Sequence, residues 1–350
     1  MARKTFVRWT LPVLAALSAC CWGSPACAAD ADIAAAPYAL GQGWRLGQSG
    51  VTIGGYGSLE VQRTGERAAH PSLAHASAFV WWEGESRWKF FAEVDNQANH
   101  TAEHETEPGE SRYVSVERIY VDYTLNDRVT LRAGKYLTPI GRWNQNHADP
   151  LVWTTSRPLI TRDLFPDNAT GVMALGSLPA LGRQASYSVF ASTGKELRPD
   201  PAEDEFKHSY GARLNVPLGE HLQAGLSYAG FSEGSMRPRQ HRLLGFDFVW
   251  AANGIEVSGE ALYRRASENT TRAATGGFVQ LVVPLWARLS AAGRFESVSN
   301  PLDPDVRQRA VLGLNWRSNR AMSLKLELVR DSGRERNAPI GLLSSISVLF

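Results

Sequence analysis

From Gly50 to the end of the chain, apolar and polar side chains alternate with a period of two residues in many short segments. Successive side chains of a β-strand point to opposite faces, so this period predicts strands with one apolar face and one polar face. In the segment 244–250, for example, Leu244, Phe246 and Phe248 alternate with Gly245 and Asp247. We expect a sheet that meets an apolar environment on one side and water on the other.

The alternation divides the chain into sixteen predicted strands. They are residues 50–64, 74–83, 86–97, 112–124, 128–137, 168–176, 183–193, 206–216, 221–231, 240–251, 254–266, 275–284, 287–298, 307–317, 321–331 and 340–350. An even count brings both chain ends to the same rim, so the sheet can close without leaving an edge. The predicted fold class is all-β, a sixteen-stranded antiparallel transmembrane β-barrel.

The lengths of the connections support a barrel that crosses a membrane. Connections after even-numbered strands are short, such as Gly84-Glu85 and Ala252-Asn253, whereas those after odd-numbered strands are longer and polar, such as 98–111 and 194–205. Transmembrane barrels have short periplasmic turns and longer outer loops. A soluble β-sandwich has no reason to sort its loops in this way. We therefore expect both termini in the periplasm.

Composition is compatible with this architecture. Charged residues make up 21% of the chain and the mean hydropathy is −0.25. No run of about 18 apolar residues follows the N-terminal region, which excludes a bundle of transmembrane helices. A barrel has a polar lumen face, so its average hydropathy stays low. The formal net charge of +2 provides no strong basic field for nucleic acid.

The first 28 residues have the pattern of an export signal. A basic start is followed by a short apolar stretch at 10–19 and by the small-residue cleavage pattern Ala26-Cys27-Ala28. A lipoprotein signal ending at Cys20 and an uncleaved anchor helix are the alternatives. We expect residues 1–28 to be a signal peptide, 29–49 an N-terminal periplasmic segment and 50–350 the barrel. The predicted location is the outer membrane of a Gram-negative bacterium.

All the cysteines lie in this leader, namely Cys20, Cys21 and Cys27. After cleavage at Ala28, disulfides, thiolate metal sites and cysteine nucleophiles are excluded.

Aromatic residues gather near the ends of the predicted strands, as in the aromatic girdles of membrane barrels. They are Trp81, Trp82, Trp88, Tyr113, Trp250, Tyr263, Trp286, Trp316 and Phe350. The last strand alternates and ends in the terminal Phe350. Such an ending looks like the signal that the barrel assembly machinery of the outer membrane reads.

Two consecutive predicted strands carry recognisable motifs, in the stretches Val116-Glu-Arg-Ile-Tyr-Val-Asp-Tyr123 and Leu131-Arg-Ala-Gly-Lys-Tyr-Leu-Thr-Pro-Ile-Gly141. Through them, residues 112–142 resemble the phosphate-selective porin O and P family. In that family, a strand with a Tyr-x-Asp element precedes one that ends in Gly-Lys/Arg-aromatic-x-x-Pro-x-Gly. The resemblance implies a sixteen-stranded homotrimeric channel. It does not imply phosphate specificity, which in that family depends on ladders of arginine and clusters of lysine, because acids are interleaved with the bases here.

The longest connection, 138–167, is the third outer loop. In sixteen-stranded porins this loop folds inward and narrows the pore, and opposed charges across such a constriction create a transverse field. The candidate constriction residues are Arg142, Trp143, His147, Asp149, Arg157, Arg162, Asp163 and Asp167. The alternative is a loop that lies over the outer mouth with solvated charges.

Strand parity also predicts which charged side chains line the pore wall. The candidates are Arg118, Asp122, Arg132, Arg213, Arg288, Arg294, Glu296, Arg309, Arg317, Lys325 and Glu327. The basic members on the three strands from 287 to 331 outnumber the acids Glu296 and Glu327, which favours a weak preference for anions. The alternative is that most of these charges pair across strands and only line a wet wall.

The expected function is a channel for passive diffusion of small polar or anionic solutes, surrounded by outer-membrane lipid, without cofactor or metal. A barrel lipase or protease is one alternative; it would need a Ser–His pair, and no G-x-S-x-G motif is present. A soluble periplasmic β-sandwich that binds a ligand is the other.

Overall fold

The computed structural model describes residues 38–63, 70–97, 100–101, 104–105, 113–146, 148–165, 167–192, 197, 206–233, 239–267, 273–299, 306–332 and 341–350. The predicted signal peptide, the three cysteines and His147 lie outside the described residues, as do the side chains of Arg162 and Asp163.

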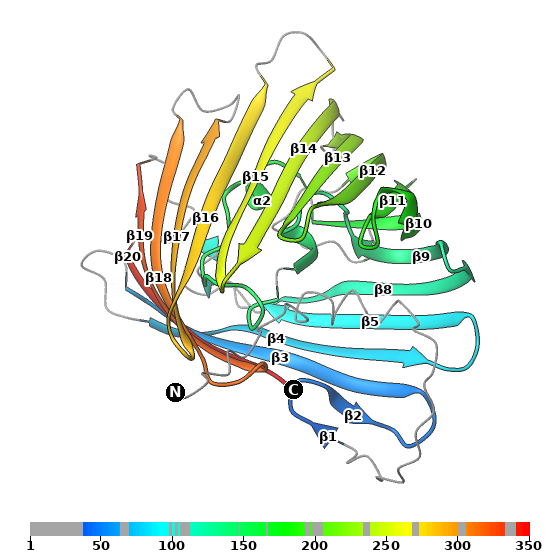
Figure 1. Cartoon of the computed structure of the whole chain (residues 1–350), viewed down its shortest axis with the longest axis horizontal. Coiled ribbons are helices and arrows are strands. Elements are labelled where there is room, and N and C mark those ends of the chain that lie inside the picture. The colour runs from blue at the N-terminus through cyan, green and yellow to red at the C-terminus, as the bar shows by residue number, and fades with distance from the viewer. Residues whose placement is uncertain are drawn as a thin grey trace, which may run out of the picture. The chain divides into compact units, whose positions relative to one another are not determined.

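One antiparallel sheet of eighteen strands makes up the described fold (Figure 1). Two of them, β1 (Tyr38–Ala39) and β2 (Gly43–Arg45), form a short hairpin beside β3. The other sixteen are β3 (Val51–Arg63), β4 (His70–Glu83), β5 (Trp88–Gln97), β8 (Tyr113–Asn126), β9 (Val129–Leu137), β10 (Asn168–Ser177), β11 (Ser186–Ser192), β12 (Phe206–Leu218), β13 (Leu222–Glu233), β14 (Arg239–Ala252), β15 (Ile255–Ala266), β16 (Ala274–Trp286), β17 (Leu289–Ser299), β18 (Arg307–Arg317), β19 (Met322–Asp331) and β20 (Gly341–Leu349).

These sixteen strands form a closed barrel. Each pairs with its neighbour in the chain, and β20 pairs with β3 in a register that runs from Leu342↔Arg63 to Leu349↔Tyr56. Every predicted strand overlaps one observed strand, with ends that differ by a few residues. The predicted sixteen-stranded antiparallel barrel is therefore confirmed. Closure supplies each strand with two hydrogen-bonded neighbours, which removes the exposed edges of an open sheet.

The hairpin β1–β2 extends the seam between the first and last strands past the end of β20. Phe350 and Gly55 exchange two backbone hydrogen bonds, each with an N–O distance of 2.8 Å, and β20 ends there. Beyond this point β2 continues as the neighbour of β3, with Trp44 opposite Ile53. The hairpin was not predicted, because strands of two or three residues are too short to show a period.

The two faces of the barrel differ as the alternation predicts. Large apolar side chains such as Leu244 and Leu312 are 58% and 66% exposed on the outside, whereas polar residues such as Arg294 and Glu327 are buried on the inside. An outer apolar surface of this kind is typical of barrels that meet lipid. One predicted girdle residue is wrong: Trp81 lies on the inner face, because it shares that face with its cross-strand partner Thr52, which is buried.

Among the described residues, helical structure is confined to the connections. The loop 138–167 contains η2 (Asn144–Asn146) and α2 (Ile160–Asp163), and η3 (Pro179–Leu181) lies between β10 and β11. A second sheet pairs β6 (His100–Thr101) with β7 (His104–Glu105). In the part of the chain that the structure describes, no helix is long and apolar enough to span a membrane.

The seam provides a test of the closed fold. A Cβ atom on Gly55 would lie 2.3 Å from the backbone oxygen of Ser77 and 2.9 Å from the ring of Phe350, whereas on Gly57 the nearest atom is the His75 oxygen at 4.0 Å. We expect Gly55→Ala to destabilise the folded barrel by about 1–3 kcal/mol. The matched variant Gly57→Ala should have little effect. Unfolding in guanidinium from lipid vesicles measures both, and equal stabilities would contradict the described seam.

Candidate functional site

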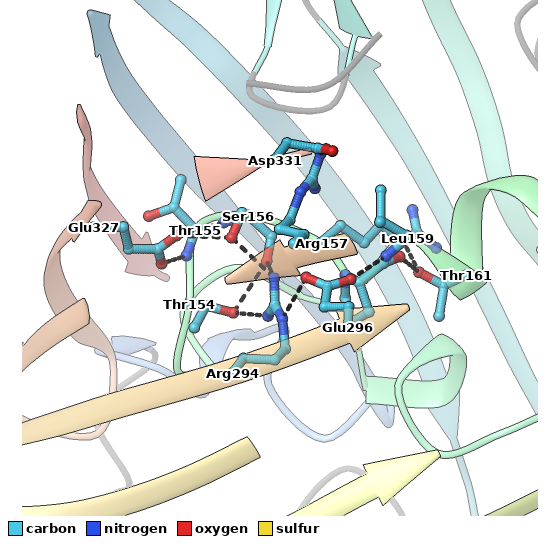
Figure 2. Close-up of polar contacts among 12 residues, drawn as sticks. Thr154, Thr155, Ser156, Arg157, Leu159, Thr161, Arg294, Glu296, Glu327 and Asp331 are labelled. Carbon is cyan, nitrogen blue, oxygen red and sulfur yellow. Dashed lines mark hydrogen bonds and ion pairs between the residues drawn. The ribbon is translucent and has the colours of Figure 1, made fainter. Parts of the chain in front are cut away.

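The loop 138–167 lies against the inner face of the strands from β13 to β20. Its hydrogen-bond partners there include Ser227 on β13, Glu260 on β15 and Ser345 on β20. All three belong to the buried polar set, and the apolar side chains that alternate with them on these strands are exposed on the outside. Figure 2 shows the contacts of this loop with β17 and β19. The loop is therefore anchored to the wall by side chains from several strands.

Buried carboxylates on the wall accept hydrogen bonds from backbone N–H groups of the loop. Glu327 on β19 accepts from the N–H groups of Thr155 and Ser156, and also from the Ser156 hydroxyl at 2.8 Å. Glu296 on β17 accepts from the N–H of Leu159 at 2.6 Å. Hydrogen bonds to a charged acceptor are stronger than neutral ones, particularly where water is excluded.

A third wall carboxylate holds the start of the loop. Glu260 accepts from the N–H groups of Arg142 at 2.8 Å and Trp143 at 2.5 Å. Gly141 precedes them with a φ of 65°, and a Cβ at this position would lie 2.3 Å from a carboxylate oxygen of Glu260. Only glycine combines this backbone conformation with so close an approach. Burial lowers the pKa of the Arg142 guanidinium, and the carboxylate of Glu256 acts in the opposite direction.

Arg294 on β17 joins the wall and the loop in one network. Its guanidinium donates to Glu296 at 2.9 Å, to the Thr154 hydroxyl at 2.5 Å and to the backbone oxygen of Ser156 at 2.8 Å (Figure 2). Its Cζ atom also lies 5.4 Å from the ring centroid of Trp143. The guanidinium is thus directed to the loop and to its own strand.

One basic residue on each of the next two strands also binds the loop. Lys325 on β19 donates to the backbone oxygen of Asp149 at 2.6 Å. Arg317 on β18 donates to the backbone oxygen of Leu151 at 2.9 Å and lies 3.8 Å above the ring of Trp153. These positive groups satisfy loop carbonyls that would otherwise be buried without donors.

Contacts within the loop close its base. Arg157 forms an ion pair with Asp167 and donates to the Thr161 hydroxyl at 3.2 Å. The Asn144 amide donates to the backbone oxygens of Thr138 at 2.9 Å and Asp167 at 3.0 Å. These contacts therefore hold the two ends of the loop together, next to the end of β9 and the start of β10.

An apolar cluster inside the barrel packs the same loop against the wall, which corrects the expectation of a uniformly polar lumen face. Its loop members are Ile140, Leu159, Ile160, Leu164 and Phe165. Its wall members are Tyr136, Ala169, Met173, Phe190, Ala229, Phe231, Leu243, Leu262, Ala274, Phe278 and Val298. Gly276 on β16 leaves the space for α2, because a Cβ there would lie 2.7 Å from Ile160.

One predicted wall residue is misplaced. Arg288 lies exposed in the turn between β16 and β17, because β16 continues to Trp286 and the strand β17 begins only at Leu289. Arg288 is separated from Arg294 by an even number of residues, which is why it was predicted on the same face, but it precedes the first residue of β17.

Four other predicted wall arginines lie on the inner face and form ion pairs there. Arg118 pairs with Glu93, Arg132 with Asp122, Arg213 with Asp247, and Arg309 with Asp331. These pairs fit the alternative in which charges neutralise one another across strands.

Several residues of the site were not among the predicted ones. Asn315, Thr155 and Ser156 all contact across the loop–wall interface. Asn315 lies at a polar-face position of its strand, and the run Thr154-Thr155-Ser156 places three hydroxyl groups in a row in the loop. Both features were visible in the sequence, but neither indicates which partner each residue contacts.

Comparison with solved structures gives porins of the same fold at low sequence identity. The anion-selective porin from Comamonas acidovorans matches with a TM-score of 0.59 and 10% identity over 85% of this chain and 98% of that one. OmpF of Salmonella typhi, solved with daunomycin, matches with a TM-score of 0.63 and 12% identity over 86% and 97%. The outer membrane channel DcaP of Acinetobacter baumannii matches with a TM-score of 0.57 and 11% identity over 86% and 97%.

Comparison of the sequence with known proteins provides less information than comparison of the structure. No protein-family model matches the chain. An uncharacterized protein of Aquifex aeolicus (strain VF5) is 28% identical over 191 residues, which cover 52% of this chain and 40% of that relative. The structural likeness thus establishes the barrel fold, and the match to the relative spans less than half of the relative's length.

The anchoring of the loop can be tested by removing one carboxylate. Glu327→Ala leaves the N–H groups of Thr155 and Ser156 without their charged acceptor, which costs about 1.5–3 kcal/mol per hydrogen bond. We expect amide hydrogen exchange in residues 154–157 to rise by about tenfold or more. Glu220→Ala, in an exposed turn, is the control and should leave this exchange unchanged. Unchanged protection in Glu327→Ala would contradict the anchoring role.

Proposed function

We propose that this protein is a porin of the Gram-negative outer membrane, which lets small polar solutes diffuse passively through its lumen. The observation that carries the proposal is the combination of a closed sixteen-stranded barrel, an exposed apolar outer surface and a polar inner face. A barrel of this size with inward polar residues suits an aqueous channel.

In this proposal the loop 138–167 is the constriction. Its hydrogen bonds go to β13, β15 and the strands from β17 to β20, so that the inner faces of β4, β5 and β8 and the first half of β9 form the opposite boundary of the path. Partly exposed charged side chains lie on these strands: Lys89, Arg118 and Arg132 are 22%, 23% and 15% exposed. Charged groups on one side of a narrow path act on the dipoles of passing solutes.

The proposed cargo is polar, and the case for an anion preference is weaker than the sequence suggested. Of the five basic residues expected to form a positive wall, Arg288 lies in a turn and Arg309 pairs with Asp331. Arg294, Arg317 and Lys325 donate to the loop. An open cluster of positive charge is therefore absent from the described residues of β17, β18 and β19.

Further parts of the proposal follow from the family resemblance and from the chain ends. The motifs in 112–142 support kinship with the phosphate-selective porin O and P family and a homotrimer; one structurally similar protein, OmpT of Vibrio cholerae, was solved in a trimer form. The signal peptide 1–28 would direct export. Recognition of Phe350 by the barrel assembly machinery would precede its pairing with Gly55 at the seam.

The rival functions make different predictions. A barrel lipase or protease would hydrolyse phospholipid or peptide, and the hydrolysis would vanish when one Ser, His or Asp was replaced. A soluble binding protein would stay dispersed without detergent and would show no heat-modifiable mobility on gels.

Conductance in planar bilayers tests the proposal directly. The folded, heat-modifiable barrel should give discrete current steps, because water and ions fill an open lumen. A variant in which residues 142–165 are replaced by a short Gly-Ser linker should conduct more than the parent, since the loop narrows the path. The control replaces 64–69, the connection between β3 and β4 in the chain, and should conduct as the parent does. A correctly folded barrel without current steps would refute the proposal.

A further inference from the structure

A row of aromatic side chains crosses three neighbouring strands on the inner face. We use the term aromatic row for Phe79 and Trp81 on β4, Phe91 on β5 and Tyr120 on β8. Trp81, Phe91 and Tyr120 are direct cross-strand partners. Ring centroids of Phe91 and Tyr120 lie 5.4 Å apart with planes 24° from parallel, and those of Phe79 and Phe91 lie 6.1 Å apart at 25°. The rings thus form a continuous apolar strip.

The aromatic row belongs to the polar face of the wall. Its members alternate along the strands with outward residues such as Val94 and Val121, which are exposed on the apolar surface. They are themselves only partly buried, and they share the face with the buried acids Glu93 and Asp122. The loop hydrogen bonds described above go to other strands, and Tyr120 packs at the edge of the apolar cluster that holds the loop. Large aromatic rings that remain partly exposed on a polar inner wall indicate a surface that contacts solutes in the lumen.

Ion pairs flank the aromatic row on both sides. Arg118 donates to Glu93 at 2.6 Å, and its Cζ atom lies 4.7 Å from the ring centroid of Phe91. On the other side Arg132 makes two hydrogen bonds with Asp122, at 2.8 and 2.9 Å, and lies 3.7 Å above the ring of Tyr120.

Each positive group of these flanks has a carboxylate partner. A third pair, Lys89 with Glu83, lies on the same flank as Arg132. The wall therefore offers donors and acceptors side by side without an unpaired positive charge to attract a simple anion, and Asp95 beside Glu93 adds a further carboxylate.

We propose that the aromatic row is a binding track for neutral polyhydroxylated ring solutes, that is, sugars. The proposal rests on the channel function proposed above and narrows its cargo. A sugar ring has an apolar C–H face that packs on an aromatic ring, as amphipathic groups do, and a rim of hydroxyl groups that both donate and accept. The paired charges match such a rim, because guanidinium groups donate to it and carboxylates accept from it.

A simple anion fits the track less well. The guanidinium groups attract an anion, but the carboxylate beside each guanidinium repels it. A simple anion also has no apolar face to pack on the aromatic rings. The combination of an apolar strip with ion-paired polar flanks therefore selects for solutes that are dipolar, uncharged and flat.

Binding of sugars to this track can be measured as block of the ion current through the channel. In planar bilayers, maltose and maltotriose should reduce the current of the parent channel saturably. We expect Phe91→Ala and Tyr120→Ala to raise the half-saturating concentration of maltotriose by about tenfold, because each removes one ring face. Phe91→Leu keeps an apolar side chain without an aromatic face and should show the same shift, which covers the case where the alanine variant does not fold.

Phe90→Ala is the matched control, since Phe90 is the neighbour of Phe91 on the outer face of β5. Its half-saturating concentration should equal that of the parent. Open channels without saturable sugar block would overturn the track but leave the channel function standing, whereas folded barrels without current would refute the channel itself. Saturable block by benzoate or phosphate but not by maltotriose would also overturn the proposal, in favour of an anionic cargo. An equal rise in the half-saturating concentration of maltotriose for Phe90→Ala would also overturn the proposal.

Discussion

Closure of the sheet by β20 and β3 is the constraint on which the other features depend. In a membrane, lipid offers no hydrogen-bond partners, so every backbone N–H and C=O of a spanning strand must pair with a neighbouring strand. The pairing from Leu342↔Arg63 to Leu349↔Tyr56, extended by Phe350 and Gly55, meets this requirement for the first and last strands. Once the sheet is closed, one face of every strand is inside, and the polar half of the alternation becomes a single enclosed surface.

The enclosed surface explains how a long loop is held in place. Carboxylates buried without partners would be costly, and so would loop N–H groups withdrawn from water. Glu260, Glu296 and Glu327 lie on three different strands, and each accepts hydrogen bonds from loop N–H groups. Apolar packing around Ile160 and Leu164 adds a second, non-directional attachment. Together these contacts hold the loop against the wall. The loop hydrogen bonds go to strands other than β4, β5 and β8, which carry the aromatic row, although Tyr120 on β8 packs against the apolar cluster.

Pairing of charges distinguishes the inner wall from a simple basic surface. Arginines of this wall that count as positive in the sequence have their charge offset by Glu93, Asp122, Asp247 or Asp331. A solute therefore encounters dipoles and ring faces more than a field of one sign. This is the physical reason why a count of bases and acids along the chain is a poor guide to what the lumen prefers.

The sequence by itself determined the number of strands, their faces and the closure of the barrel, because a period of two residues and the parity of loop lengths are local properties of the chain. It also identified most inner charges and the loop 138–167. Only the tertiary structure decided that Arg288 lies past the end of its strand, that Trp81 faces inward, and that Glu327 meets Thr155 from 172 residues away. Parity fixes the face of a residue but neither its height along the barrel nor its neighbour across strands. Those depend on register and on the path of the loop, which the folded chain sets through contacts distant in sequence.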